Sequence, residues 1–364
     1  MGIQCGIVGL PNVGKSTIFN AITNAGAQAA NYPFCTVDPN VGTVTVPDPR
    51  IEKLAEVVKP RNVQRAVMQF VDIAGLVRGA SKGEGLGNQF LSHIREVDAV
   101  MHVVRCFEDG DVTHVEGSVN PIRDIGIIDT ELALKDMETV EKRMSKDERA
   151  AKSQDKKAKA AMEVWPKLLA ALNEGKAARS VDLTEDEREI ARELQLLTSK
   201  PILYCCNVLE SEIHTGNAHV ETVRQHAASE NASMVMISGK IEAELSQLEP
   251  EEKAVFLEEL GMKESGLDTV IQAAYALLGL QTYFTAGVQE VRAWTFRKGW
   301  KGPACAGVIH SDFERGFIRA ETIAWKDFET HGTQLACKEK GLQRSEGKEY
   351  VVQDGDILNF LFNV

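Results

Sequence analysis

The chain has 364 residues, of which 43% are hydrophobic and 26% are charged, and its formal net charge is -12. The composition is that of an ordinary globular protein, and the length suggests two or three domains. The negative charge excludes a protein that binds polyanions over its whole surface, so any nucleic-acid interface must be a local patch.

The seven cysteines form no C-x-x-C pair, and most of them stand in apolar runs. This usage favours reduced, buried thiols in a cytoplasmic protein over disulfides or a cysteine zinc site. The sequence has no signal peptide pattern and no long apolar span, so we expect no membrane association. We also expect a monomer.

The first predicted elements are a buried strand over residues 3–8 and a helix that begins near Thr17. The stretch between them reads G-x-x-x-x-G-K-S, the pattern of a loop whose backbone N–H groups surround a phosphate at a helix N-terminus. We expect Lys15 to contact the terminal phosphates as a catalytic residue and Ser16 to ligate Mg²⁺. The candidate phosphate-binding residues are Asn12, Val13, Gly14, Lys15, Ser16 and Thr17.

A polar, proline-punctuated loop over residues 31–40 leads into an alternating strand over residues 41–46. A phosphate loop of this class needs a second protein oxygen ligand for Mg²⁺. This ligand binds the ion while the terminal phosphate is present and leaves it after the phosphate is lost. Thr36 is the candidate for that second Mg²⁺ ligand. The alternative is a threonine at a strand edge without a metal.

Residues 67–71 form another apolar run, and Asp72-Ile73-Ala74-Gly75 follows it as D-x-x-G. We expect Asp72 to hold Mg²⁺ and the Gly75 N–H to contact the terminal phosphate, which is a catalytic role. The next residue is Leu76, where Ras-like enzymes carry the glutamine that orients the attacking water. Leucine cannot hydrogen-bond water, so we expect slow hydrolysis or another residue that positions the water.

Two further features follow in the same half of the chain. The glycine-rich stretch over residues 79–87 is expected to be a mobile switch loop. His114 lies in the loop after a predicted strand over residues 99–104, at the edge where doubly wound sheets bind ligands. It could orient or deprotonate a water as a catalytic residue, and the alternative is a surface histidine without a role.

Residues 129–200 break the alternation of strands and helices, and we predict a projecting antiparallel helical arm. A seam of apolar residues at spacings of four and three runs along its second half, and Gly175 ends that helix. Residues 184–187 form a capping box that begins another helix, with Ile190, Leu194 and Leu197 on its inner face. The seam consists of Ala158, Met162, Trp165, Leu169 and Leu172.

The arm also carries a local excess of positive charge. Residues 135–159 contain nine lysines and arginines against six acids, an excess of three. This patch could contact RNA phosphates, with Lys152, Lys156 and Lys157 as candidates, and the alternative is an ordinary solvated helix face.

The strand predicted over residues 201–206 precedes the second half of the nucleotide site. Guanine-binding enzymes of this class place N-K-x-D there, and this chain has Asn207, Val208, Leu209 and Glu210 instead. The longer Glu210 displaces the two acceptor oxygens, and Val208 replaces the lysine that packs along the base. Since one good hydrogen-bond pair is worth ~1–3 kcal/mol, we expect guanine selectivity to be weak or inverted towards adenine.

The next predicted strand, over residues 234–237, ends in Ser238, Gly239 and Lys240, whose backbone we expect to close over the base edge. Helices are predicted over residues 251–260 and 267–278.

From residue 282 onward the composition favours β-structure, with strands predicted over residues 288–296, 304–309, 317–323 and 350–362. Basic and aromatic residues alternate within this part and could clamp single-stranded RNA, whereas the alternative is a core strand followed by a charged turn. The candidates are Arg292, Trp294, Arg297, Lys298 and Lys301.

These motifs together resemble the YchF branch of the Obg-like ATPases, a family of the translation-factor P-loop proteins, over essentially the whole chain. The motifs that carry the resemblance lie at residues 9–17, 31–40, 72–77, 83–87, 207–210, 306–313 and 316–321. The resemblance implies a Mg-dependent ATPase that binds ribosomes and has a C-terminal TGS domain. It also implies His114 as the catalytic histidine, and a K⁺ ion near Asn12.

We therefore predict an α/β fold: a doubly wound P-loop NTPase sheet with an inserted helical coiled-coil arm, then a β-grasp-like (α+β) TGS domain. The expected boundaries are 1–128 and 201–280 for the two parts of the nucleotide-binding domain, 129–200 for the arm and 281–364 for the TGS domain. The expected function is a ribosome-associated switch that hydrolyses ATP, with GTP less preferred. The alternatives are a GTP-specific Obg-type GTPase and an RNA- or ribosome-binding protein that uses nucleotide as a structural ligand.

Overall fold

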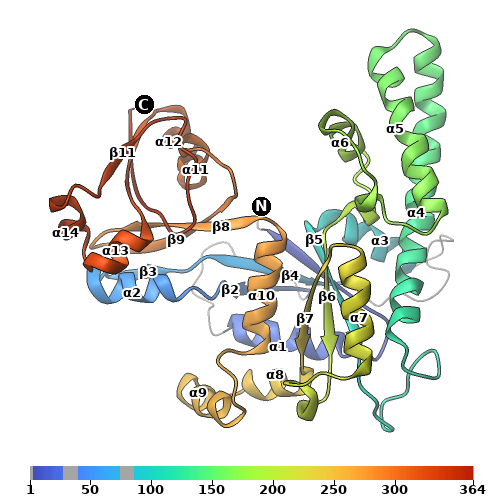
Figure 1. Cartoon of the computed structure of the whole chain (residues 1–364), viewed down its shortest axis with the longest axis horizontal. Helices are drawn as coiled ribbons and strands as arrows, with labels where there is room; N and C mark the ends of the chain where they lie inside the picture. Colours follow the sequence, from blue (N-terminus) through green and yellow to red (C-terminus); the bar gives the residue numbers. More distant parts are fainter. Residues whose placement is uncertain (1–2, 28–39, 74–85, 364) are drawn as a thin grey trace. The chain divides into compact units, whose positions relative to one another are not determined.

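The computed structural model describes residues 3–27, 40–73 and 86–363 (Figure 1). The chain divides into two compact units. The first unit comprises Met1–Val44 and Gln69–Ala274, and the second comprises Thr45–Met68 and Tyr275–Val364. The mixed α/β fold is the one predicted, with a P-loop sheet, a helical arm and a C-terminal part.

The first unit is built on a sheet with the strand order β2-β4-β1-β5-β6-β7. β1 pairs in parallel with β4 and β5, and β6 pairs in parallel with β5 and β7. Because the carboxyl ends of parallel strands meet at one edge, the residues after these strands gather there, where open α/β sheets bind ligands. The strands are β1 (Gln4–Val8), β2 (Val41–Thr45), β4 (Val67–Asp72), β5 (Ala99–Arg105), β6 (Ile202–Asn207) and β7 (Ser233–Ile237).

Helices cover both faces of this sheet. Tyr204 and Cys206 of β6 pack in one apolar cluster with Val220 and Val223 of α7 (Ala218–Ser229). Alternate strand residues point to opposite faces, so the residues between them face the other layer. Further helices before residue 280 are α1 (Lys15–Ala27), α3 (Leu86–Glu96), α8 (Gly239–Leu245), α9 (Pro250–Glu259) and α10 (Gly266–Leu277).

The arm is formed by α4 (Pro121–Lys152) and α5 (Lys156–Asn173), which lie side by side and project from the sheet (Figure 1). Trp165 is fully buried between them and donates from Nε1 to Asp147 Oδ2 at 2.9 Å. α4 begins eight residues before the predicted start of the arm, because Asn120 caps it and a proline occupies its first turn. Of the predicted seam, Ala158, Trp165 and Leu172 are buried, whereas Met162 and Leu169 are partly buried at its margin.

The chain returns from the arm through α6 (Glu185–Arg192), which begins with the predicted capping box at Thr184 and Glu187. The prediction that Leu194 and Leu197 lie on this helix is wrong, because it ends at Arg192. Both leucines are nevertheless buried. The short helices of this segment are η2 (Ala178–Ser180) and η3 (Leu197–Ser199).

Asp136 of α4 binds the segment that follows α6 to the base of the arm. Its buried carboxylate accepts from Leu197 N and Thr198 N at 2.8 Å each, and from Thr198 Oγ1 at 2.7 Å. Burial raises the pKa of Asp136, and the three donors oppose that shift by favouring its charged form.

The second unit contains a sheet with the order β11-β10-β12-β8-β9-β3. Residues 45–68, which the sequence placed within the nucleotide-binding domain, contribute α2 (Pro49–Val58) and β3 (Asn62–Gln64), and β3 pairs in parallel with β9. The other strands are β8 (Leu280–Ala286), β9 (Glu290–Arg297), β10 (Phe317–Ile323), β11 (Arg344–Glu346) and β12 (Ile357–Phe362).

One predicted strand of this unit is a helix. Residues 304–309 belong to α11 (Gly302–Ile309), where a proline occupies the first turn. A short apolar run cannot by itself be assigned to a strand or to a buried helix, which explains the error. The predicted strand over residues 350–362 is confirmed only for its second half. The remaining helices are α12 (Ser311–Arg315), α13 (Trp325–His331) and α14 (Gln334–Glu339).

Six of the seven cysteines are buried free thiols, and Cys35 lies outside the described residues. Within residues 3–27, 40–73 and 86–363, no helix combines the length and apolar character needed to cross a membrane.

Candidate functional site

The predicted phosphate loop joins β1 to α1, as its sequence required. Gly14 has φ of 94°, and Asn12 has φ of 62°, so both lie in the left-handed region. A Cβ atom on Gly14 would lie 2.1 Å from Asn207 Nδ2, which excludes any side chain at that position. The loop opens on a cavity of about 410 Å³ that Lys15, Ser16 and Thr17 help to line.

Lys15 and Asp72 meet at the mouth of this loop. Lys15 is the first residue of α1 and Asp72 the last of β4, and Lys15 Nζ lies 3.3 Å from Asp72 Oδ1. Their side chains are 11% and 22% exposed, so both remain accessible to a ligand. Ser16 follows Lys15 on the first turn of α1. The structure thus brings together three residues that the sequence assigned to phosphate and Mg²⁺.

Asn207 connects the phosphate loop with the start of α8. Its Nδ2 donates to Val13 O at 2.9 Å, and its Oδ1 accepts from Gly239 N at 2.9 Å. Asn207 is buried at the end of β6, so this amide has little competition from water. One side chain therefore sets the position of the phosphate loop relative to the loops after β6 and β7.

A second cavity, of about 770 Å³, adjoins the phosphate loop, with which it shares Asn12, Gly14 and Thr17. Val208 is buried beside it, and its N–H donates to Ile237 O at 2.9 Å. Leu209 N donates to Glu212 Oε2 at 3.3 Å. The N–H groups of Val208 and Leu209 are therefore already engaged within the protein. The predicted residues that line this cavity are Asn12, Gly14, Thr17, Asn207, Val208, Leu209, Glu210, Ser238, Gly239 and Lys240.

The acid that replaces the guanine-binding aspartate has a protein partner. Lys240 Nζ lies 3.1 Å from Glu210 Oε2, across the mouth of the cavity. Both side chains are largely exposed, so the pair is weak by itself. It nevertheless gives the Glu210 carboxylate a partner other than the base.

Arg105 organises the opposite wall of this cavity and was not predicted from the sequence. It is fully buried at the end of β5 and donates to the carbonyl oxygens of Phe107, Asp109 and Val112 at 3.1, 3.3 and 2.9 Å. Its guanidinium also lies 4.5 Å from the centre of the Phe107 ring. Phe107, Asp109 and Val112 all line the cavity. An arginine at the end of an apolar strand was the only signal in the sequence.

His114 is not a surface histidine. It is buried, its Nε2 lies 2.8 Å from Asp124 Oδ2, and its Nδ1 accepts from Glu116 N at 3.0 Å. Because Nδ1 accepts a backbone N–H, the ring proton lies on Nε2, which donates to Asp124. The neighbouring residue contacts the phosphate loop, since Asn12 Nδ2 donates to Thr113 O at 3.1 Å.

The candidate RNA-binding residues of the arm lie on its surface. Lys152 pairs with Glu148 at 2.9 Å, and Lys156 and Lys157 are exposed on the first turn of α5.

The candidate RNA-binding residues of the second unit are partly engaged with other side chains and partly exposed. Arg292 lies 3.9 Å above the Trp294 ring, and Trp294 donates to Thr285 Oγ1 and stacks on buried Tyr283. Arg297 and Lys298 are exposed at the end of β9, and Lys301 is exposed and pairs with Glu349. Two predicted site residues, Thr36 and Gly75, lie outside the described residues, as does Leu76.

Comparison with protein families and known proteins gives matches over the whole chain. A family model described as a 50S ribosome-binding GTPase matches residues 4–131, and the model YchF-GTPase_C, described as a protein of unknown function, matches residues 280–363. Ribosome-binding ATPase YchF of Bacillus subtilis is 60% identical over 366 residues, covering 100% of both chains. The protein of that name from Escherichia coli O157:H7 is 53% identical over 364 residues, again covering 100% of both.

A solved structure agrees with these matches. The YchF GTPase of Schizosaccharomyces pombe is 40% identical, with a TM-score of 0.89, and the alignment covers 99% of this chain and 98% of that one.

The Lys15 contact leads to a first prediction. Replacing Lys15 with alanine removes the cation at the mouth of the phosphate loop and leaves Asp72 without its partner. We expect triphosphate affinity to fall by roughly 10- to 150-fold, the value of a hydrogen bond to a charged group. Titration of a fluorescent ATP analogue measures this, and the exposed Lys176→Ala variant serves as the control. Equal affinity in the Lys15 variant and the wild type would contradict the phosphate-site assignment.

Proposed function

The chain belongs to the YchF family, and on that premise we propose that it is a ribosome-associated, Mg²⁺-dependent ATPase. The observation that carries the proposal is the continuous site in which Asn207 joins the phosphate loop to a cavity of base size. The names of the relatives, which are ribosome-binding ATPases, support the same function. We place the protein in the cytoplasm, where ribosomes are.

We propose that Lys15 neutralises the terminal phosphates while Ser16, Asp72 and Thr36 hold Mg²⁺. The fit rests on the donor set: the Ser16 hydroxyl and the Asp72 carboxylate are hard oxygen ligands at the phosphate loop, which suits magnesium. A bound Mg²⁺ would offset the negative charge on the phosphates during transfer. The Gly75 N–H is proposed to contact the last phosphate.

We also propose a K⁺ ion near Asn12. Its Nδ2 is used by Thr113 O, so the side-chain oxygen is the group that could face a monovalent cation. Asn12 is exposed at the phosphate loop, so its side chain is accessible to an ion.

The base cavity favours ATP over GTP. Guanine recognition needs a carboxylate that accepts two hydrogen bonds, and Glu210 is longer than the required aspartate and pairs with Lys240. Val208 is buried and apolar, so position 208 does not supply the lysine stem that packs along guanine in N-K-x-D. Two alternatives remain to be separated from this proposal. A GTP-specific switch would bind GTP more tightly than ATP, and an RNA-binding protein with a structural nucleotide would not hydrolyse ATP.

We propose that His114 positions the attacking water in place of the missing glutamine. In the geometry described, its Nε2–H is held by Asp124, and Arg123 in turn holds Asp124 Oδ1 at 2.8 Å. His114 must therefore leave Asp124 before it can approach a phosphate. Movement of Asn12 on nucleotide binding would reach His114 through the contact with Thr113 O.

The base site gives a second prediction. Val208→Lys combined with Glu210→Asp restores the lysine and a shorter acid that no longer reaches Lys240. We expect the ratio of ATP to GTP affinity to swing towards GTP by ~1–3 kcal/mol, the value of one regained hydrogen-bond pair. Competition titrations measure the ratio, and Glu210→Asp alone separates the two contributions. An unchanged ratio in the folded double variant would argue against base reading at these positions.

The proposed role of His114 gives a third prediction. We expect His114→Ala to lower kcat by ~10²-fold while ATP affinity stays nearly intact, since the group is used only in the transition state. Steady-state turnover and equilibrium binding together test this, and His219→Ala on α7 is the control. If the variant turns over ATP as fast as the wild type, His114 is not the catalytic residue.

The proposed association with ribosomes gives a fourth prediction. If Lys156 and Lys157 contact RNA, affinity for ribosomes should fall steeply with salt, because each neutralised phosphate releases counterions. Charge reversal of both lysines to glutamate should weaken binding further and reduce the salt slope. Sedimentation with ribosomes at several salt concentrations measures this, with Lys253→Glu and Lys263→Glu as the matched control. Binding that ignores both salt and the charge reversal would exclude these lysines from the interface.

A further inference from the structure

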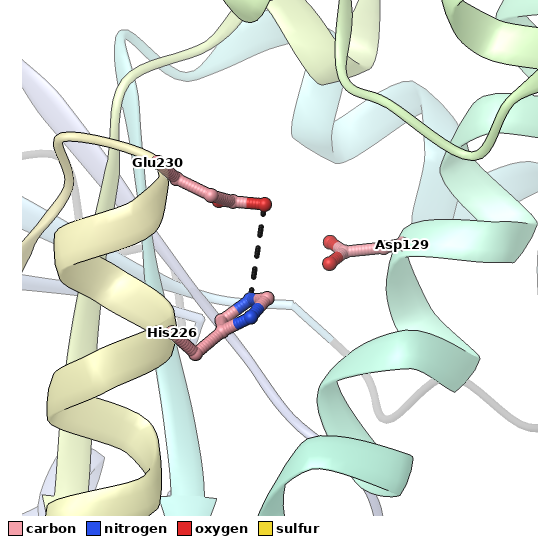
Figure 2. A group of neighbouring side chains, drawn as sticks. All are labelled: Asp129, His226 and Glu230. Carbon is pink, nitrogen blue, oxygen red and sulfur yellow. Dashed lines mark ion pairs between the residues drawn. The ribbon is translucent and has the colours of Figure 1, made fainter.

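Three side chains with metal-binding atoms converge at the base of the arm, away from the nucleotide cavities. Asp129 comes from α4, whereas His226 and Glu230 belong to α7 and the residue that ends it, one turn apart. Figure 2 shows the three side chains pointing towards one another across the gap between these two elements. One ligand atom from each lies within 4.8 Å of the other two.

Glu230 is oriented by two groups that leave one oxygen directed at His226. Its Oε2 accepts from Arg179 Nη2 at 2.8 Å and from Tyr204 Oη at 3.1 Å. Its Oε1 lies 3.7 Å from His226 Nε2, which is too long for a hydrogen bond. His226 Nε2 instead lies 3.3 Å from Tyr204 Oη, a contact that a metal ion on this nitrogen would replace. A carboxylate held at one oxygen and presented at the other is the arrangement that supporting residues give to a metal ligand.

Asp129 provides the second, independent observation. Among the described residues its carboxylate has no hydrogen bond and no ion pair, although it is half-buried and faces the other two ligands. Burial raises the pKa of Asp129 to about 6, with Arg179 lowering it and Glu230 raising it. The carboxylate thus stands in surroundings that penalise its negative charge without offering a cation close enough to pair with it.

The charges around the cluster leave room for a cation. Two carboxylates face one guanidinium, that of Arg179, which is engaged with Glu230 Oε2. His102, fully buried with its ring 5.8 Å from that of Tyr204, adds no positive charge, because burial lowers its pKa to about 3. The His226 and Glu230 side chains are 24% and 25% exposed, which leaves an entry path for an ion.

We propose that Asp129, His226 and Glu230 bind a Zn²⁺ ion that links α4 at the base of the arm to α7. One imidazole nitrogen and two carboxylate oxygens suit a divalent first-row metal better than Mg²⁺, which prefers oxygen alone. Bonds of about 2.0–2.2 Å place tetrahedral ligand atoms about 3.3–3.6 Å apart. The pair from His226 and Glu230 is already near that spacing, and a small shift of Asp129 completes three ligands, with water as the fourth.

The test uses the full chain, dialysed against a chelator and kept in Mg²⁺ so that oxygen-only sites are filled. Zn²⁺ is titrated against a chromophoric competitor. We expect one site of micromolar affinity in the wild type. Asp129→Asn and His226→Gln should each weaken it by at least 10- to 100-fold, because each removes one of the three ligands.

His219→Gln is the matched control, because His219 Nε2 also lies 3.7 Å from a carboxylate oxygen, that of Glu108, and within the described part of the chain no third metal-binding side chain joins this pair. It should bind Zn²⁺ as the wild type does. Equal Zn²⁺ affinity in the wild type and His226→Gln, or no wild-type site of micromolar affinity, would overturn the proposal.

Cobalt provides a readout that does not depend on the variants folding. Co²⁺ bound to the wild type should give the ligand-field spectrum of a four- or five-coordinate ion with nitrogen and oxygen ligands. A thiolate charge-transfer band would place the ion on cysteines, and a spectrum of six-coordinate Co²⁺ like that in water would indicate no built site. Either spectrum would overturn the proposal.

Discussion

The side chain of Asn207 is the constraint on which the candidate site depends. Its amide spans from Val13 O in the phosphate loop to Gly239 N at the start of α8, with 2.9 Å at each end. Gly14 must lack a side chain because a Cβ there would lie 2.1 Å from the same amide. An aspartate at this position would set an oxygen against Val13 O and lose the donor. The phosphate loop and the base cavity are therefore positioned by one buried group.

The rest of the cavity is built without the groups that read guanine. Arg105 holds the wall that contains Phe107 by donating to three carbonyl oxygens. Glu210 forms an ion pair with Lys240, so its carboxylate already has a partner within the protein. What remains for recognition is the shape of the cavity, apolar contact and polar groups of its lining. These groups include the Asn207 amide and the Ser238 hydroxyl, whose buried Oγ has no hydrogen-bond partner among the described residues. These features are compatible with adenine, and position 210 no longer carries the aspartate of N-K-x-D, which is the physical basis of the proposed preference for ATP.

The sequence predicted those features that are set by local pattern. The phosphate loop, the strands of the first sheet and the capping box at Thr184 depend on neighbouring residues, and the structure has all of them. The helix over residues 302–309 was missed because a short apolar run fits either state. Arg105 and the strand at residues 62–64 were missed because their roles depend on partners far along the chain. The catalytic role of His114 stays a prediction. The geometry shows only that its hydrogen bond to Asp124 must break before His114 can approach a phosphate.

The affinity of the wild-type protein for ATP and for GTP, measured by competition against one labelled nucleotide in Mg²⁺, tests the account most directly. A cavity positioned by Asn207 and lacking the aspartate of N-K-x-D predicts that ATP binds at least as tightly as GTP. GTP binding tenfold or more tighter than ATP would contradict it, because some group in the cavity would then be reading the guanine edge.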